Sequence, residues 1–175
     1  LNLVVHVGTF TNQRRRQRFE FLERRAAHRV LTLGQREREC YRRRVREAQE
    51  VGHDPVMQMT CRDRNRIGIQ SDLMGASMLG IRNILCLTGD YPTVGDHKEA
   101  KPVYDLDSVE VMQLVQGLNN GRDMAGNKLD GSTSFTIGAA VTPEADPLGP
   151  MLAKFELKVK AGAQFFQTQA IYHPE

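Results

Sequence analysis

The chain has 175 residues, which is enough for one domain of ordinary size. Its 40% hydrophobic and 26% charged residues, with a net charge of +3, are typical of a soluble globular protein and exclude a disordered chain. No apolar run approaches the ~18 residues of a membrane span, and the three scattered cysteines indicate neither disulfides nor a zinc site, so we expect a cytoplasmic protein without a structural metal.

The N-terminal segment carries most of the positive charge. Residues 1–50 contain 13 Arg, no Lys and 6 Glu, a net charge of +7. Arginine runs could bind phosphates, but the segment lacks interleaved aromatic side chains and any DNA-binding motif, so nucleic acid is not the expected partner. A solvated face, an irregular end, and a divergent or mistranslated stretch all fit this composition. We therefore expect residues 1–45 to be a poorly packed segment, and residues 46–175 to be the folded part.

After residue 51 the sequence alternates between strand and helix patterns. Residues 56–61 are rich in apolar side chains, which indicates a buried strand. Apolar residues at helical spacing over 69–80 predict a helix that ends at a glycine. Residues 83–88 form the next expected strand, and a loop rich in glycine, proline and charge covers residues 91–106.

The second half of the chain repeats this alternation. Asp107, with Glu110 three residues later, forms a capping box that predicts a helix. Glycine-containing turn signals over residues 121–134 predict a small surface hairpin. Two further strands are expected over residues 135–141 and 164–171.

A third helix is expected between those last two strands. Asp146 followed by Pro147 predicts a capped N-terminus with proline in the first turn, and Gly162 ends the helix. Five side chains at helical spacing form its expected core stripe: Leu148, Met151, Leu152, Phe155 and Val159.

Apolar strands that alternate with helices indicate a parallel sheet covered on both faces. A doubly wound sheet and a β/α barrel both satisfy this pattern. The barrel is favoured because polar residues follow the carboxyl ends of successive strands, where barrel enzymes place their chemistry, and because no GxGxxG turn is present. These residues are Thr60, Asp90, Thr142 and Gln169. The expected fold class is therefore α/β, a partial β/α (TIM) barrel with about four consecutive units of an eightfold barrel.

Seven short motifs, in this order and spacing, carry a specific resemblance. They are residues 59–66 (MTCRDRNR), 87–90 (LTGD), 99–102 (EAKP), 105–108 (DLDS), 139–141 (AAV), 145–147 (ADP) and 166–169 (FQTQ). Together they make residues from about 46 to 175 similar to the methylenetetrahydrofolate reductases of one bacterial subgroup. The resemblance implies a flavin-dependent oxidoreductase on a β/α barrel, with four central strands from this chain and a weak fifth near residues 3–7.

The same resemblance implies the reaction and its cofactors. The family reduces 5,10-methylenetetrahydrofolate to 5-methyltetrahydrofolate, with FAD, in preference to FMN, as the bound flavin and NAD(P)H as the electron donor. Folate and reduced nicotinamide are thus the expected partners, with a homo-oligomer, a fusion or a partner subunit left open. Two alternatives stand beside this interpretation: an inactive fragment of the barrel, or a flavin-free pterin-binding barrel of the methyltransferase type.

The resemblance also assigns roles at the expected edge. Asp90 matches the aspartate that lies beside the flavin and helps to bind folate, and it is the expected catalytic residue. Thr88 and Gly89 match positions whose backbone approaches the flavin, although other family members carry arginine in place of Thr88. Gln169 matches the glutamine that binds the pterin, since its amide offers both a donor and an acceptor.

The remaining matched positions are expected to bind the flavin. Lys158 matches a lysine that meets the flavin phosphates, although a solvated helix-face lysine is the simpler reading. Gln58, Tyr104 and Thr142 match positions that line the flavin. The general acid of the family, a glutamate in a Glu-x-x-Pro-Pro setting, has no counterpart in this sequence.

Overall fold

The computed structural model describes residues 2–4, 35–169 and 171. In chain order its elements are β1 (Asn2–Val4), α2 (Gln35–Glu50), β2 (Val56–Thr60), α3 (Arg66–Met78), β3 (Asn83–Leu87), η1 (Pro92–Val94), α4 (Ser108–Asn119), β4 (Thr136–Val141), α5 (Leu148–Lys160) and β5 (Phe165–Thr168). The strands β2 to β5 each begin within one residue of the position that the sequence predicted.

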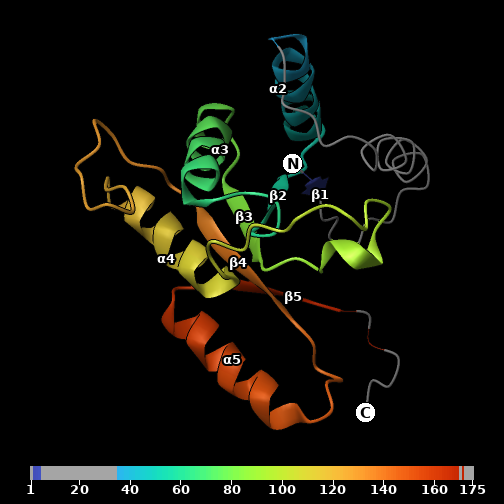
Figure 1. Ribbon diagram of the computed structural model, residues 1–175. Helices are drawn as coiled ribbons and strands as arrows, with labels where there is room; N and C mark the ends of the chain where they lie inside the picture. The colour runs from blue at the N-terminus through green and yellow to red at the C-terminus, as the bar shows by residue number, and fades with distance from the viewer. Residues whose placement is uncertain (1, 5–34, 170, 172–175) are drawn as a thin grey trace.

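The strands form one sheet in chain order, β1-β2-β3-β4-β5 (Figure 1). Strands β2 to β5 are parallel to one another, and each connection between them contains a helix. This confirms the α/β fold class, with four parallel units consistent with a partial TIM barrel. β1 covers part of the weak strand expected near residues 3–7 but pairs with β2 in the antiparallel direction, so it does not extend the β/α repeat.

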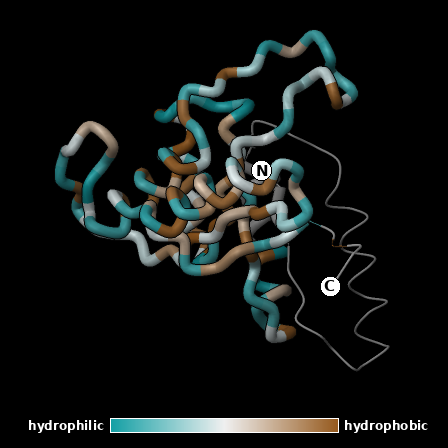
Figure 2. The backbone as a smooth tube through the Cα atoms, turned by 90° about the horizontal axis from the view of Figure 1, so that it is seen from below, coloured by the Kyte–Doolittle hydropathy of each residue, from teal (hydrophilic) through white to brown (hydrophobic). Residues whose placement is uncertain are grey.

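The main core lies on the face of the sheet that carries Met57, Met59 and Cys61, which are buried. These side chains join those of α3 and α4 in one cluster, and Figure 2 shows the hydrophobic residues concentrated in the centre with hydrophilic loops around it. On the second face, Leu85 is also buried, whereas its neighbour Gln58 on β2 is half-buried. The second face is therefore covered in part by the described residues, as expected of the inner face of part of a barrel.

Helix α4 begins as the sequence predicted. The Asp107 carboxylate accepts hydrogen bonds from the backbone N–H groups of Val109 and Glu110, both at 2.8 Å. The Glu110 carboxylate accepts one from the Asp107 N–H in return, also at 2.8 Å. Substituting such a cap typically costs about 1 kcal/mol, because backbone donors at a helix start otherwise lack partners. The capping box thereby fixes where α4 starts, directly beside the long loop.

Helix α5 differs from its prediction in two respects. Pro147, and not Asp146, is the N-cap, and no side chain caps this helix. Leu148, Leu152 and Val159, expected in the core, are 47%, 53% and 47% exposed. Phe155 of the same predicted stripe does pack against the sheet, where its ring centroid lies 4.6 Å from that of Phe166. The side chain of Lys158 is also buried on this helix. A pattern of apolar residues at helical spacing does not predict a buried lysine.

Helix α2 crosses the expected boundary at residue 45. Val45 is fully buried and belongs to the core cluster, and the Gln49 amide donates to the Gly80 carbonyl at 3.2 Å. The rest of the expected segment, apart from β1, lies outside the described residues. None of the described helices is both long and apolar enough to span a membrane.

Candidate functional site

The carboxyl ends of the parallel strands bring four polar residues to one edge of the sheet. Thr60 ends β2, and its register partner is Leu87, the last residue of β3. Asp90 follows β3, Thr142 follows β4, and Gln169 follows β5. The Gln169 N–H donates to the Val141 carbonyl at 3.0 Å, which keeps the ends of β4 and β5 level. This edge is the candidate site.

A glycine turn carries the chain from β3 to Asp90. Gly89 has a φ of +87°, which an L side chain rarely adopts. A Cβ atom there would lie 3.3 Å from the Cβ of Arg62 and 3.4 Å from that of Thr60. The Gly89 carbonyl accepts a hydrogen bond from the Tyr104 hydroxyl at 3.2 Å. The turn is therefore seated closely against the end of β2 and held from the other side by the long loop.

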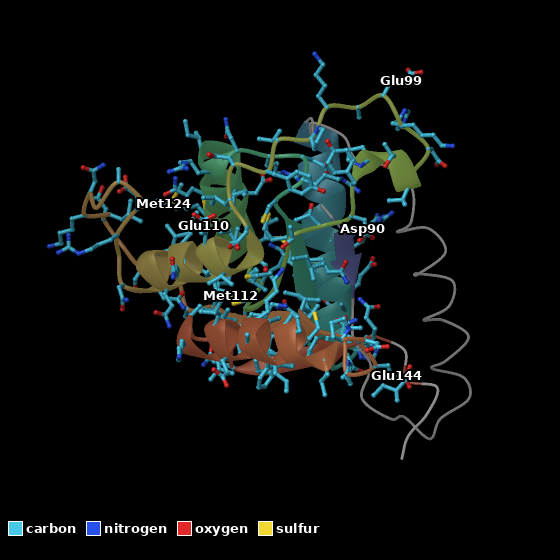
Figure 3. The ribbon with its side chains drawn as sticks, turned by 60° about the horizontal axis from the view of Figure 1, so that its bottom comes forward. Asp90, Glu99, Glu110, Met112, Met124 and Glu144 are labelled. Carbon is cyan, nitrogen blue, oxygen red and sulfur yellow. The ribbon has the colours of Figure 1, made fainter. Side chains whose placement is uncertain are left out.

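The Asp90 carboxylate is exposed, and within the described residues it accepts no hydrogen bond. Its backbone carbonyl is held instead, by the Arg62 Nη1 at 3.4 Å. Figure 3 shows Asp90 beside the strands, with Glu99 farther out on the loop that follows. A fixed backbone with a free carboxylate is the arrangement expected of a residue that meets a ligand.

The loop over residues 91–106 is tied to this edge at three points. Besides the Tyr104 hydroxyl, the Val103 N–H donates to the Arg62 carbonyl at 2.7 Å. Asp105 makes a bidentate ion pair with Arg66, with both N–O distances at 2.9 Å, and accepts from the Arg66 backbone N–H at 2.8 Å. These bonds lower the pKa of Asp105 to about 2. The ring of Tyr104 also stacks on Tyr91, with centroids 6.0 Å apart.

Lys158 is not the solvated lysine of the simpler reading. Its side chain is buried, 8% exposed, and its ammonium donates to the Ala140 carbonyl at 2.5 Å. Burial lowers the pKa of this lysine, with a further contribution from the neighbouring charge of Lys154 and opposition from Asp107. The ammonium thus lies against β4, one residue before that strand ends, and its charge is directed at the backbone.

The other expected residues occupy different parts of the edge. Gln58 lies within β2, opposite Leu85, and is half-buried on the second face of the sheet. Thr88 and Thr142 are half-buried just beyond β3 and β4, and Gln169 is exposed. The structure therefore brings Thr88, Gly89, Asp90 and Tyr104 into one cluster, whereas Lys158 approaches from the helical side.

Two residues in this cluster were not predicted to be site residues from the sequence. Arg62 and Asp63 follow β2, and their side chains pair through two hydrogen bonds, at 2.7 and 3.0 Å. Both belong to the motif at residues 59–66, but only the structure shows that Arg62 reaches across to the Asp90 turn. The signal in the sequence was their place directly after a strand, which is the position of catalytic residues in barrels.

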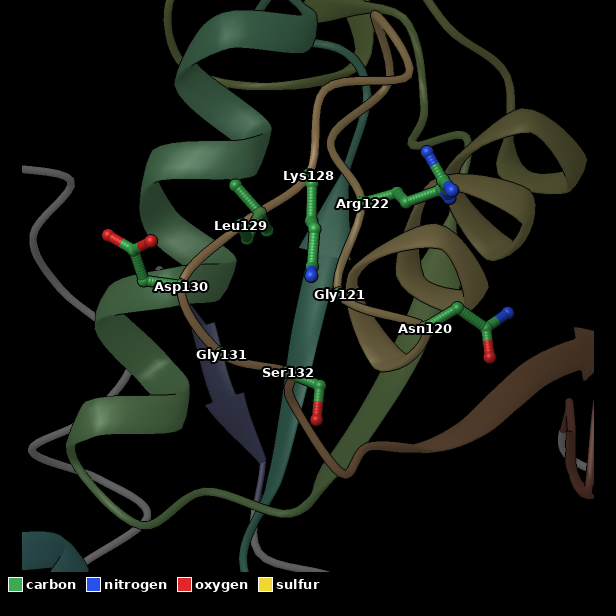
Figure 4. Close-up of a pocket in the computed structure, with 8 residues that line it drawn as sticks. All are labelled: Asn120, Gly121, Arg122, Lys128, Leu129, Asp130, Gly131 and Ser132. Carbon is green, nitrogen blue, oxygen red and sulfur yellow. The ribbon is translucent and has the colours of Figure 1, made fainter.

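A separate cavity of about 360 Å³ lies at the other end of α4 (Figure 4). It is lined by residues 120–122 and 128–132 of the loop between α4 and β4. The hairpin expected there is reduced to a single antiparallel bridge between Arg122 and Lys128. Because this loop leaves the C-terminus of α4, while the candidate site faces its N-terminus, the cavity is not part of the site.

The residues at the edge fit the ring of a flavin better than its phosphates. Polar backbone around Gly89, the Tyr104 hydroxyl and the free Asp90 carboxylate form an edge suited to a planar heterocycle. For the phosphates the assigned cation is Lys158, which is already bonded to Ala140. Among the described residues, no group of three His, Cys, Asp or Glu side chains could hold a metal ion.

Comparisons with known proteins agree with this architecture. Residues 32–175 match the family described as "Methylenetetrahydrofolate reductase". A curated relative from Schizosaccharomyces pombe, "Methylenetetrahydrofolate reductase 2", is 34% identical over 129 residues, which is 68% of this chain and 18% of the relative. A "Probable methylenetetrahydrofolate reductase (NADPH)" from Caenorhabditis elegans is 29% identical over 128 residues, 71% of this chain and 17% of the relative. The chain thus spans less than a fifth of the length of either relative.

Proposed function

Because the chain belongs to the methylenetetrahydrofolate reductase family, we propose that it forms the central part of the substrate-binding site of such an enzyme, at the carboxyl edge of the sheet. The proposed reaction is the reduction of 5,10-methylenetetrahydrofolate to 5-methyltetrahydrofolate with electrons from NAD(P)H. FAD, in preference to FMN, is the proposed bound cofactor. The described cysteines Cys61 and Cys86 are free, buried thiols, which supports the cytoplasmic location expected from the sequence.

The observation that carries this proposal is the Asp90 turn. Its backbone is fixed by Tyr104 and Arg62, while its carboxylate accepts no hydrogen bond from the described residues. A carboxylate held in this way is available to a ligand without prior rearrangement, which favours binding and reaction alike. We assign Asp90 to the pterin of the folate, where it accepts hydrogen bonds and places a negative charge beside the reacting groups.

Neighbouring residues complete the proposed edge. When bound, a flavin supplies the hydride that the folate receives. Thr88 and the Gly89 backbone lie where they can approach its ring, and Gln58, Tyr104 and Thr142 line the same region. Lys158 donates one of its three N–H groups to the Ala140 carbonyl, and the other two are the proposed donors to the phosphates. Gln169, exposed after β5, is assigned to the opposite edge of the pterin, for which its amide provides both a donor and an acceptor.

One chemical role has no candidate in the described part of the chain. Opening the methylene bridge requires a proton donor, and the Glu-x-x-Pro-Pro motif of the family is not in this sequence. Glu110 cannot serve, because its carboxylate is committed to the cap of α4. A second candidate function is a flavin-free pterin-binding barrel of the methyltransferase type, which would not carry out this reduction.

The two candidates differ in flavin binding, which can be measured on the 175-residue chain itself. Titration with FAD, followed by flavin absorbance and fluorescence, should show saturable binding if the chain forms the proposed edge. A parallel titration with 5-methyltetrahydrofolate tests the pterin site. Folate binding without flavin binding would support the second candidate, and binding of neither ligand would contradict both.

We predict that Asp90→Asn preserves flavin binding but impairs the folate half of the reaction. The substitution keeps the shape of the side chain and removes the charge that the proposal places beside the folate. Loss of such a group should cost about 1.4–4 kcal/mol, or roughly ten- to a thousandfold in the rate at which folate reoxidises the reduced flavin. Stopped-flow absorbance measures this rate in a version of the chain in which the first strand of the family, with its glutamate, has been restored.

The matched control is Asp96→Asn, which removes a charge from an exposed position in the same loop. It should leave the reoxidation rate within about twofold of the original, because surface charges several residues away act weakly through water. Normal reoxidation by the Asp90→Asn variant would reduce Asp90 to an ordinary turn residue.

A further inference from the structure

Arg62 contacts the Asp90 turn in several ways that the proposed roles leave unexplained. It follows β2, and its Nη1 donates to the Asp90 carbonyl at 3.4 Å. Its Cβ lies 3.3 Å from where a side chain on Gly89 would begin, so the arginine packs directly against the turn. Its own carbonyl accepts the Val103 N–H at 2.7 Å. Arg62 therefore joins the end of β2, the Asp90 turn and the long loop.

Asp63 fixes the orientation of this guanidinium. The Arg62 Nε donates to one Asp63 oxygen at 2.7 Å, and Nη2 donates to the other at 3.0 Å. This bidentate geometry holds the plane of the guanidinium and leaves Nη1 for Asp90. The two side chains are 32% and 34% exposed, so their pairing adds little to overall stability. Its consequence is the direction in which the arginine points.

We propose that Arg62 is a positioning residue for Asp90, with Asp63 as the group that orients it. The pair holds the Gly89–Asp90 turn against β2, so that the Asp90 carboxylate keeps one direction at the edge of the sheet. This inference rests on the proposed function and deepens it, because a preorganised carboxylate binds the folate without first ordering its own loop.

Arg64 offers a matched control two residues along the same segment. Its Nε pairs with Asp72 of α3 at 2.5 Å, and these side chains are 21% and 29% exposed. Arg62→Gln and Arg64→Gln each remove one positive charge and one ion pair. Only the first removes a contact with the turn, so any difference between the two variants reports on that contact.

The first experiment needs no ligand, and its result stands whether or not the proposed function is correct. Hydrogen exchange is measured in the full chain, by mass spectrometry or NMR, at two amides that tie these segments together: the Cys61 N–H, which donates to the Leu87 and Thr88 carbonyls, and the Val103 N–H, which donates to the Arg62 carbonyl. Arg62→Gln should raise these exchange rates roughly tenfold, the equivalent of one hydrogen bond of about 1.4 kcal/mol. Asp63→Asn should act in the same direction, and Arg62→Lys should restore protection in part, because lysine keeps the charge but not the fork. Rates in Arg62→Gln equal to those in Arg64→Gln would overturn the proposal.

The second experiment is a double-mutant cycle on folate affinity, with 5-methyltetrahydrofolate as the probe. Arg62→Gln should weaken binding roughly tenfold in the original chain but less than about twofold in the Asp90→Asn background, because Arg62 acts through Asp90. The same tenfold loss in both backgrounds would overturn the positioning role. If the unaltered chain binds no folate, the proposed function fails, and the exchange experiment alone decides the inference.

Discussion

At the scale of single residues, Gly89 has little freedom to change. Its φ of +87° disfavours any residue that has a Cβ, and Arg62 and Thr60 lie close to the place where that Cβ would be. Gly126 has almost the same φ, +90°, but nothing lies within 4 Å of the place where its Cβ would be. A comparison of alanine substitutions at the two glycines therefore separates the cost of backbone strain from the cost of crowding around the new Cβ.

We predict that Gly89→Ala destabilises the chain more than Gly126→Ala does. A left-handed backbone costs a non-glycine residue about 1–2 kcal/mol, and both variants incur this cost. Gly89→Ala should lose about 1 kcal/mol more, since Arg62 and Thr60 must move to admit the new methyl group. Urea unfolding of both variants measures the difference. Equal losses would show that the turn is not seated as closely as the geometry indicates.

The sequence correctly predicted the position of individual residues where a motif determines the backbone conformation. It did not predict which polar side chains are buried. The LTGD motif placed Gly89 and Asp90 in a turn after a strand, and the structure has them there. Lys158 looked like a surface lysine because its helix ends nearby, yet its ammonium is buried against Ala140. No local pattern shows that a lysine will reach a backbone carbonyl of another element.

Among the connecting elements, the loop between β3 and α4 contains one ion pair, between Asp105 and Arg66, whose strength depends on pH. The Asp105 carboxylate accepts two hydrogen bonds from the Arg66 side chain and one from the Arg66 backbone N–H. These bonds lower the pKa of Asp105 from 3.8 to about 2. Since the folded pKa lies below the unfolded one, the pair contributes stability above about pH 4 and loses it as the pH falls toward 2.

We predict that Asp105→Asn removes part of the acid sensitivity of the chain. The difference in unfolding free energy between the original chain and this variant should be largest at pH 6 and should shrink as the pH falls toward 2. Asp96→Asn, in the same loop, should show no such convergence. The measurement is urea unfolding at a series of pH values. A difference that is independent of pH would mean that the ion pair does not form in solution.

Helix α5 gives the second test at this scale. Phe155→Ala removes a ring that packs on Phe166, and for a half-buried site we expect a loss of about 1–3 kcal/mol. Leu152→Ala removes a side chain that is 53% exposed and should cost less than about 1 kcal/mol. Thermal unfolding distinguishes the two. A larger loss for Leu152→Ala would restore the core stripe that the sequence predicted.

Strands and helices could be predicted where a sequence pattern is compatible with only one kind of secondary structure. The apolar runs of β2 to β5 predict strands, the capping box predicts the start of α4, and the structure contains all of these elements. For α5 the predicted stripe is right in part: Phe155 packs on Phe166, but Leu152 and Val159 are exposed and the buried Lys158 was not predicted. Which side chains of the helix are buried depends on what the helix packs against.

For the whole molecule, the sheet order could be inferred from the sequence, but the degree to which each face is covered could not. Strand and helix alternation implies parallel neighbours, and β2 to β5 pair in that way. The same alternation implied a sheet covered on both faces, whereas on the second face Leu85 is buried and Gln58 is only half-buried. The direction of β1 also had no signal, because three residues cannot show which way a strand pairs.

The pairing of each strand with the one before it has a consequence for how the chain reaches its native state. Val56 pairs with Asn83, and Gly138 pairs with Phe165, so partners in two of the three parallel ladders are separated by little more than one helix and its turns. Low contact order of this kind speeds folding, because each chain closure is short. By the same reasoning, the ladder between β3 and β4, whose partners Asn83 and Thr136 are separated by α4 and its loops, should be the slowest of the three parallel ladders to form.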